Sequence, residues 1–109
     1  MLKRSANTVV YLAGKINGDP DYRKKFRSAE VKLAYMDYIV LNPAALPHGL
    51  DPKDYMRISL AMLESADAVV LLPDFETSEG ATIEERYASY IGKTVSYYDL
   101  ITNKEENKT

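Results

Sequence analysis

The sequence contains no cysteine and no tryptophan, and its 109 residues include only one histidine and two phenylalanines. The absence of cysteine excludes disulfides, thiolate catalysis and iron–sulfur clusters. No apolar run approaches the roughly 20 residues that a transmembrane helix requires, and no apolar signal segment follows Met1. From these absences we expect a soluble protein of the cytoplasm that neither spans nor binds a membrane.

An excess of charge of one sign is also missing, because 14 Lys and Arg oppose 16 Asp and Glu, for a net charge of -2. Such a balance argues against binding to the phosphate backbone of a nucleic acid polymer. One histidine and scattered acids provide no metal-ligand spacing, so we expect no bound metal and no cofactor. Tyrosine, by contrast, is abundant, with nine residues. A ring with a polar tip is typical of ligand pockets and subunit interfaces.

Short apolar segments alternate with helical patterns along the chain. The segments occupy residues 8–13, 38–41, 67–72 and 94–98. Their continuous apolar character is typical of strands that are buried on both faces of a parallel sheet. Between them, apolar residues recur at helical spacing, and Asp-Pro pairs at 19–20 and 51–52 predict an N-cap and a first residue for the first two helices.

This alternation predicts one α/β domain over residues 1–98, a flavodoxin-like (Rossmann-like) three-layer sandwich with a parallel sheet in the order 2-1-3-4. We expect three helices, the first alone on its face, and a frayed polar tail over residues 99–109. Ligands of such sheets bind at the carboxyl ends of the strands, where the strand order reverses. The expected walls of the site are therefore residues 14–19, 42–47 and 73–80.

The predicted helix over residues 53–65 is apolar on two sides. One stripe consists of Met56, Leu60 and Leu63, and the other of Tyr55, Ile58 and Met62. The first stripe is expected to face the sheet. The second predicts a homodimer through this helix, because two-fold dimers are the commonest small oligomers. The alternative is that the loop over residues 42–52 folds across it.

The stretch after the third strand combines an acidic loop with the pattern Ser78-x-Gly80-Ala-x-x-Glu84. A hydroxyl cap and a glycine in the first turn of a helix leave backbone N–H groups free to bind an anion. Glu84 falls in the second turn and is expected near the carboxyl ends of the strands. The spacing alone fits a solvated helix glutamate equally well.

Three parts of the sequence together resemble the nucleoside 2-deoxyribosyltransferase superfamily, which includes the deoxynucleoside 5′-monophosphate N-glycosidases. They are the first strand continuing into Gly14-Lys-Ile-Asn-Gly, the Ala66-Asp67 pair, and the pattern from Ser78 to Glu84. The helix start at Tyr55 and the acidic loop are most similar to a compact uncharacterised branch of that superfamily from phages and bacteria. The resemblance covers residues 8–98 and implies transfer or hydrolysis of the N-glycosidic bond of a nucleoside or nucleotide.

By this resemblance, Glu84 is the nucleophile that attacks C1′ of the sugar and holds it as a glycosyl ester, and Tyr11 orients the Glu84 carboxylate. Ser78 corresponds to a serine that contacts sugar or phosphate. Lys15 and Asn17 fall where the monophosphate hydrolases bind phosphate. A core tyrosine, a plain N-cap and exposed turn residues are the structural alternatives for Tyr11, Ser78 and this last pair.

The sequence departs from the superfamily at Ser59, where the resemblance places an aspartate that assists the leaving base. A hydroxyl of ordinary pKa cannot transfer a proton as a carboxylic acid does at neutral pH. The possible substitutes are Asp54, Asp74, Glu76 and Glu79, and the sequence does not select one. A protein that binds a nucleotide or nucleotide-derived signal without turning it over is therefore the alternative function.

The expected substrate-binding set is completed by residues at the predicted walls. Besides Lys15, Asn17, Ser59 and Ser78, it contains Gly14, Asn42 and Gly80. His48 lies between Pro47 and Gly49 and is expected to be an exposed loop residue, with contact to a base as the alternative.

Overall fold

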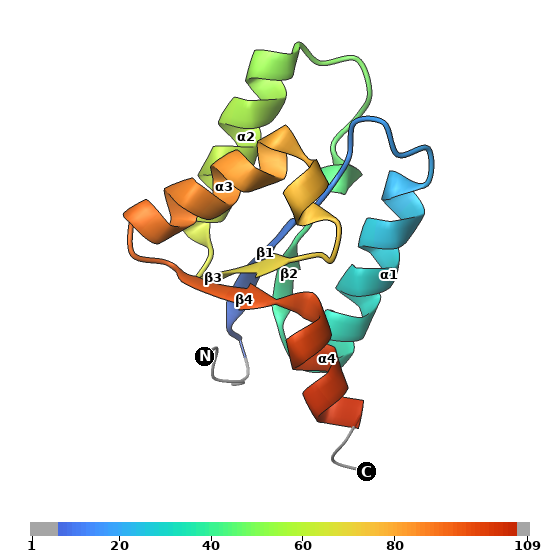
Figure 1. The fold of residues 1–109 in the computed structure, drawn as a ribbon, viewed down its shortest axis with the longest axis vertical. Coiled ribbons are helices and arrows are strands. Elements are labelled where there is room, and N and C mark those ends of the chain that lie inside the picture. The colour runs from blue at the N-terminus through green and yellow to red at the C-terminus, as the bar shows by residue number, and fades with distance from the viewer. Residues whose placement is uncertain (1–6, 107–109) are drawn as a thin grey trace.

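The computed structural model describes residues 7–106, and the side chains of residues 7–103. Its centre is a single sheet of four strands (Figure 1). The strands are β1 (Val9–Ala13), β2 (Ile39–Leu41), β3 (Ala68–Leu71) and β4 (Thr94–Tyr97). Their order is β2-β1-β3-β4 and every pairing is parallel. The predicted flavodoxin-like α/β fold is confirmed.

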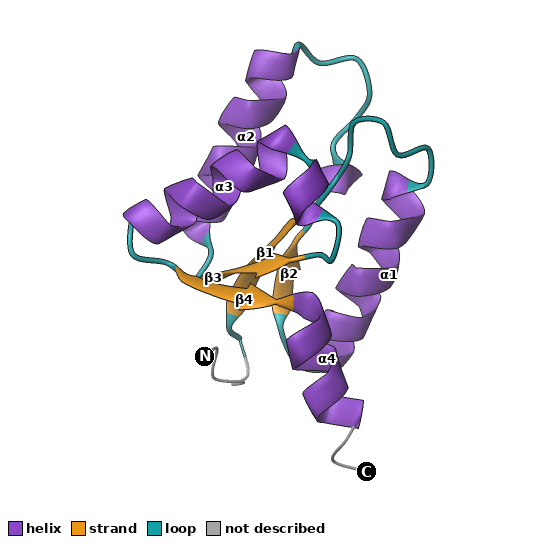
Figure 2. Ribbon diagram, viewed as in Figure 1, coloured by secondary structure: helices purple, strands orange, loops and turns teal. Residues whose placement is uncertain are grey.

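Helices cover both faces of the sheet (Figure 2). On one face lie α2 (Pro52–Ser65) and α3 (Glu79–Tyr90), and on the other α1 (Tyr22–Tyr35) and α4 (Tyr98–Glu106). Two short 3-10 helices, η1 (Pro43–Ala45) and η2 (Phe75–Thr77), interrupt the loops after β2 and β3. Among the described residues, no helix has the length and apolarity needed to span a bilayer.

The alternation of side chains along β1 decides which residues reach which helices. Val10 and Leu12 belong to the apolar cluster under α1, whereas Tyr11 and Ala13 belong to the cluster under α2 and α3. All four side chains are fully buried. Since successive strand residues point to opposite faces, this register places the Tyr11 phenol in the layer that also contains Glu84.

The C-terminal segment differs from the prediction. Residues 98–106 form α4 instead of a frayed tail, and residues 107–109 lie outside the described residues. Tyr98 and Ile101 pack against the cluster under α1, and Thr102 between them and the helix end is only 4% exposed. These two side chains hold α4 against the sheet, but two apolar residues are too few to form a helical stripe that can be recognised in the sequence. The expectation that α1 stands alone on its face was therefore wrong.

The start of α1 is also later than predicted. The helix begins at Tyr22 with Asp21 as its N-cap, and no side chain caps it. The carboxylate of Asp19 instead accepts a hydrogen bond from the Asp21 backbone N–H at 2.9 Å and another from Lys25. Asp19 thus shapes the turn before the helix, and this turn borders the candidate site.

Candidate active site

A cavity of about 770 Å³ opens at the carboxyl ends of β1 and β3. Tyr11 of β1 lines it, together with residues from four segments of the chain. These segments fall within residues 14–22, 43–48, 52–59 and 78–84. The cavity lies where the reversal of strand order predicts it, and its size is typical of small-molecule sites. The acidic loop after Pro73 contributes to the expected wall only from Ser78 onward.

Tyr11 and Glu84 form the polar centre of this cavity. The Tyr11 hydroxyl donates a hydrogen bond to Glu84 Oε2 at 2.7 Å. Tyr11 is fully buried and Glu84 is 7% exposed, yet both reach the cavity surface. Within the described part of the chain, the other carboxylate oxygen, Oε1, makes no hydrogen bond and is not sealed off from solvent. That oxygen is therefore available to a ligand.

The surroundings of this pair change the acidity of both groups. Burial raises the pKa of Glu84 to about 7, and the hydrogen bond from Tyr11 offsets only part of this effect. Burial also raises the pKa of Tyr11 far above its ordinary value, and the negative charge of Glu84 adds to the increase. Glu84 can therefore exchange a proton near neutral pH, whereas Tyr11 stays a phenol that donates its hydrogen bond.

Ser59 joins the pair from the neighbouring helix. It lies on α2, is 8% exposed and lines the cavity. Its hydroxyl lies close enough to the Tyr11 phenol to counteract part of the increase in the phenol's pKa that burial and Glu84 cause. Side chains of α2, β1 and α3 thus form one polar row. Its serine supplies a hydroxyl at the position where the resemblance calls for a carboxylic acid.

None of the four acids considered as substitutes for that carboxyl lines the cavity. Asp54 forms an ion pair within α2 at 3.7 Å. Asp74 is held by Lys25, and Glu76 and Glu79 are exposed. In the described part of the chain, no three histidine, aspartate or glutamate side chains gather closely enough to hold a metal ion.

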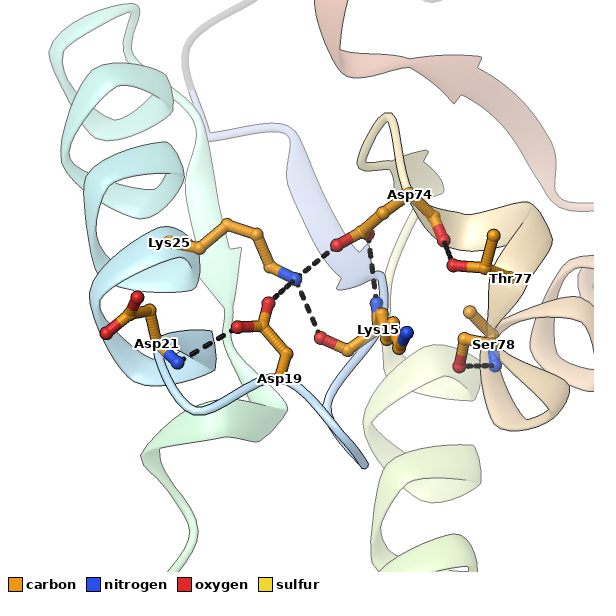
Figure 3. A network of polar contacts seen from close by, with 8 residues as sticks. Lys15, Asp19, Asp21, Lys25, Asp74, Thr77 and Ser78 are labelled. Atoms are coloured by element: carbon orange, nitrogen blue, oxygen red, sulfur yellow. Dashed lines mark hydrogen bonds and ion pairs between the residues drawn. The ribbon is translucent and has the colours of Figure 1, made fainter.

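A second polar group fixes the loops at the mouth of the cavity (Figure 3). Lys25 Nζ donates to Asp19 Oδ2 at 2.6 Å, to the Lys15 carbonyl oxygen at 2.8 Å, and to Asp74. Asp74 Oδ1 in turn accepts the backbone N–H of Lys15 at 3.0 Å. One ammonium group therefore ties α1 to the loops that follow β1 and β3. Lys25 could not be predicted from the sequence, because nothing in the spacing distinguishes it from other lysines of α1.

Four more of the predicted binding residues line the cavity, namely Gly14, Asn17, Ser78 and Gly80. A Cβ atom at Gly14 would lie 2.9 Å from Leu72 Cδ1, so this wall has no room for a side chain. The Ser78 Oγ accepts the Ala81 backbone N–H at 3.1 Å. Ser78 is thus the N-cap of α3 and part of the cavity wall, and its two suggested roles are compatible.

Lys15 and Asn42, expected to bind substrate, do not line the cavity. The Asn42 Oδ1 accepts the Ala44 backbone N–H at 2.8 Å, and its Nδ2 donates to Glu30 Oε1 at 3.0 Å. The amide is thus occupied in capping η1 and bonding to α1. Lys15 contributes to the network at the mouth through its backbone atoms. The Lys15 side chain lies at the edge of the cavity, because its Cε is 3.7 Å from where a Cβ atom of the lining residue Gly18 would stand. Binding of substrate by Lys15 and Asn42 stays a prediction.

Aromatic side chains that the sequence did not assign to the site complete the wall. The rings of Tyr22 and His48 lie nearly perpendicular, with centroids 6.4 Å apart, and both line the cavity. His48 is exposed as expected, but it borders the cavity as well. The Tyr55 hydroxyl donates to the Pro47 carbonyl and accepts the Leu50 backbone N–H at 3.3 Å. These bonds hold the loop after β2 against α2.

The bonds of Tyr55 bear on the expected dimer surface. At Tyr55 the structure shows the alternative to a dimer contact, because the loop over residues 42–52 folds against this side chain. Tyr55 also lines the cavity. Ile58 and Met62 are half-buried, and Met62 packs against the cluster under α2 and α3. A homodimer through α2 stays a prediction. Ile58 is the residue of this stripe that belongs to neither of the two apolar clusters.

Comparisons with known proteins place this site within one family domain. No curated protein matches the chain. A family model described as a domain of unknown function (DUF4406) matches residues 8–97, a range that contains all four strands as well as Tyr11, Ser59 and Glu84. Because the match extends over most of its length, the chain belongs to the DUF4406 family.

Proposed function

We propose that this protein transfers or hydrolyses the N-glycosidic bond of a nucleoside or nucleotide, with Glu84 as its nucleophile. One observation carries the proposal: a buried carboxylate has one oxygen held by Tyr11 and the other oxygen free toward a cavity of about 770 Å³. The motifs that resemble the nucleoside 2-deoxyribosyltransferase superfamily support it, because Tyr11, Ser78 and Glu84, three of the residues that they match, line this cavity.

In the first step, Glu84 Oε1 attacks C1′ of the sugar while the bond between C1′ and the base nitrogen breaks. The electron pair of that bond leaves with the base, which takes up a proton from water. In the second step, water or a nitrogen of another base attacks C1′ and releases the Glu84 carboxylate. With water as the attacking group, one proton returns to solvent and the outcome is hydrolysis.

The side chains around Glu84 suit this chemistry. Tyr11 holds Oε2 and so limits the rotation of the carboxylate, which keeps Oε1 directed toward the sugar. An ionised carboxylate also stabilises the positive charge that develops on the sugar ring. Since the pKa of Glu84 is raised to about 7, this ionised form and the protonated form coexist at neutral pH.

The alternative function, binding of a nucleotide without turnover, is favoured by Ser59. This residue is buried beside Tyr11, at the position where the resemblance requires an acid. Among the described residues, Asp19 is the one other carboxylate in the lining, and hydrogen bonds from Lys25 and from the Asp21 backbone keep its pKa low. An ionised Asp19 cannot protonate a leaving base, so departure of the base depends on water.

Incubation of the protein with a panel of nucleosides and 5′-mononucleotides tests the proposal. Chromatography measures free base, and thermal shift measures binding. We expect slow release of base by the wild type and a faster release by Ser59→Asp, because a second carboxyl beside Glu84 has its pKa raised and can then act as an acid near pH 7.

A matched control is Ser65→Asp, which changes an exposed serine of the same helix outside the lining. Binding without base release by both the wild type and Ser59→Asp contradicts the enzyme proposal and supports the binding protein. The absence of both binding and release with every member of the panel contradicts both functions.

A further inference from the structure

Two aromatic rings from separate segments of the chain meet at the wall of the cavity. Tyr22 is the first residue of α1, and His48 lies in the loop between η1 and α2. Their ring centroids are 6.4 Å apart at an interplanar angle of 87°, and both residues line the cavity. Because the rings are perpendicular, a flat molecule that stacks on one of them turns its edge toward the other. This pair is termed the aromatic corner.

The aromatic corner and the polar row around Glu84 come from opposite faces of the sheet. Ser59 and Glu84 belong to α2 and α3 on one face, whereas Tyr22 belongs to α1 on the other (Figure 1). The lining residues that precede His48 in its segment are apolar, namely Pro43, Ala44 and Leu46. A ligand that reaches from the polar row to the corner therefore meets hydroxyl and carboxyl groups at one end and aromatic and apolar surface at the other.

The corner also offers hydrogen bonds. Within the described part of the chain, no hydrogen bond engages the ring nitrogens of His48, which is exposed. An imidazole can donate through one nitrogen and accept through the other, and a phenol can donate its proton while it accepts a bond. Nucleic acid bases are bound in this way by proteins, with their faces stacked on aromatic side chains and their edges hydrogen-bonded.

Arg23 holds both rings of the corner, although it does not line the cavity itself. Its Nε donates to the Tyr22 hydroxyl at 3.0 Å, and its guanidinium carbon lies 5.7 Å from the centroid of that ring. Its Nη2 donates to the Leu46 carbonyl oxygen at 2.8 Å, two residues before His48. One guanidinium therefore connects the start of α1 to the loop that carries the second ring.

We propose that the aromatic corner binds the base of the substrate and that Arg23 is the positioning residue that holds the two rings together. This inference rests on the proposed function and places the part of the substrate that leaves. Displacement at C1′ requires the nucleophile and the departing base on opposite sides of that carbon. With the base in the corner and the sugar at the polar row, Glu84 approaches C1′ from the side opposite the base.

The fluorescent nucleoside 2-aminopurine 2′-deoxyriboside tests this placement, because stacking on aromatic rings quenches the emission of its base. A titration gives the Kd and the quenching at saturation, both read directly on mixing because release of the base is expected to be slow. We expect the wild type to quench the probe. Tyr22→Leu and His48→Ala should each raise the Kd about tenfold and reduce the quenching at saturation, since they remove a stacking surface.

Two conservative variants and one control separate stacking from a general loss of structure. Tyr22→Phe and His48→Phe keep a flat ring at each position and should restore most of the quenching. Lys53→Ala alters an exposed residue at the start of α2 outside the lining and should behave as the wild type. Quenching at saturation reports the bound complex alone, so a partly unfolded variant does not imitate the loss of stacking.

Arg23→Met leaves both rings in place but removes the bonds that hold them. We expect the Kd of the probe to rise about threefold with weaker quenching, and the KM for base release to rise with kcat nearly unchanged. Arg27→Met is the matched control, because Arg27 is an exposed arginine one turn further along α1 and outside the lining. Unchanged Kd and quenching in Arg23→Met would overturn its positioning role.

The outcomes keep this inference apart from the proposed function. Binding of the probe without quenching, or quenching that Tyr22→Leu and His48→Ala both leave unchanged, overturns the base subsite, while release of base seen by chromatography leaves the proposed function standing. Quenching by the wild type that these variants abolish, without release of base, supports the subsite and contradicts catalysis alone. Neither binding nor release with any nucleoside overturns both.

Discussion

The carboxylates in and beside the cavity lie in two environments that differ sharply. The side chains of Asp19 and Asp74 are 23% and 30% exposed and share the ammonium of Lys25. Glu84 is 7% exposed and has a phenol as its partner instead of a cation. A half-exposed carboxylate beside a lysine is easily accommodated by a folded protein. A buried carboxylate without a cation opposes folding, because the ionised group loses its hydration without compensation.

The pKa shifts record the same contrast. Hydrogen bonds from Lys25 and from the Asp21 backbone lower the pKa of Asp19, whereas burial raises the pKa of Glu84 to about 7. The Lys25 network has an evident structural purpose, since it joins two loops and a helix. No comparable structural gain explains Glu84. A titratable group kept in an unfavourable place within a cavity is typical of a functional site.

The strongest test of this contrast is Glu84→Gln. The amide preserves the shape of the carboxylate and can still accept the hydrogen bond of Tyr11, but it cannot form a glycosyl ester. We expect base release to fall by on the order of a thousandfold or more, with binding of nucleosides largely retained. Chromatography of free base and calorimetry measure the two effects separately.

The matched control for this change is Glu85→Gln, which alters the neighbouring residue of α3 outside the cavity lining. Its rate of base release should equal that of the wild type. A Glu84→Gln protein that retains more than about a tenth of the wild-type rate would exclude a covalent role for this residue.

The pH dependence of stability gives the next largest effect. Between its ordinary pKa of 4.5 and the raised value of about 7, Glu84 is protonated in the folded protein and ionised in the unfolded chain. The unfolded state then binds fewer protons, so the free energy of unfolding falls as the pH rises through this window. The contribution is complete below pH 4.5, and the loss above pH 7 is on the order of 3 kcal/mol.

Urea unfolding of the wild type and of Glu84→Gln, from pH 4 to pH 8, measures this contribution, since the amide does not titrate. The difference in free energy between the two proteins should change across the window. Asp19 acts with the opposite sign, because its lowered pKa provides stability that is lost only as the pH falls below about 3.8. Parallel curves for the two proteins would show that Glu84 is ionised in the fold.

How well a feature can be predicted from the sequence depends on how far apart in the chain the interacting residues lie. The strands and the positions of α2 and α3 were predictable, because buried strands and N-caps such as Ser78 depend on residues close together in the chain. The strand order followed from the rules for crossovers between parallel strands. The contact between Tyr11 and Glu84 joins residues 73 positions apart. Motifs placed both residues at the carboxyl ends of the strands, and the topology then brings those ends together.

Features that rest on a few contacts between distant residues were not predictable. Lys25 meets Asp19 six positions away and Asp74 49 positions away, and no periodic pattern connects the three. The α4 helix docks through Tyr98 and Ile101 within a polar stretch, which does not form an amphipathic stripe. Such contacts depend on how the loops are oriented after the sheet has formed, and the local sequence does not encode that orientation.

The smallest expected effect comes from breaking the network with Lys25→Met. Methionine is similar to lysine in length but removes the ammonium, which also lies 5.5 Å from the ring centroid of Phe26. Without that charge, Asp19 and Asp74 repel each other. Because these groups are partly exposed, the free energy of unfolding should fall by only about 1 kcal/mol in a urea titration. The loops at the mouth lose a common anchor, while Tyr11 and Glu84 keep their hydrogen bond.

Steady-state kinetics of Lys25→Met should therefore show a KM raised a few-fold, with kcat nearly unchanged, the reverse of the pattern for Glu84→Gln. Lys24→Met is the control, because Lys24 is an exposed neighbour on α1. A kcat that falls as far as it does in Glu84→Gln would mean that the two groups act as one catalytic unit. An unchanged KM, with only the loss of stability, would instead confine Lys25 to holding the loops together, because binding would then not depend on how firmly the mouth is anchored.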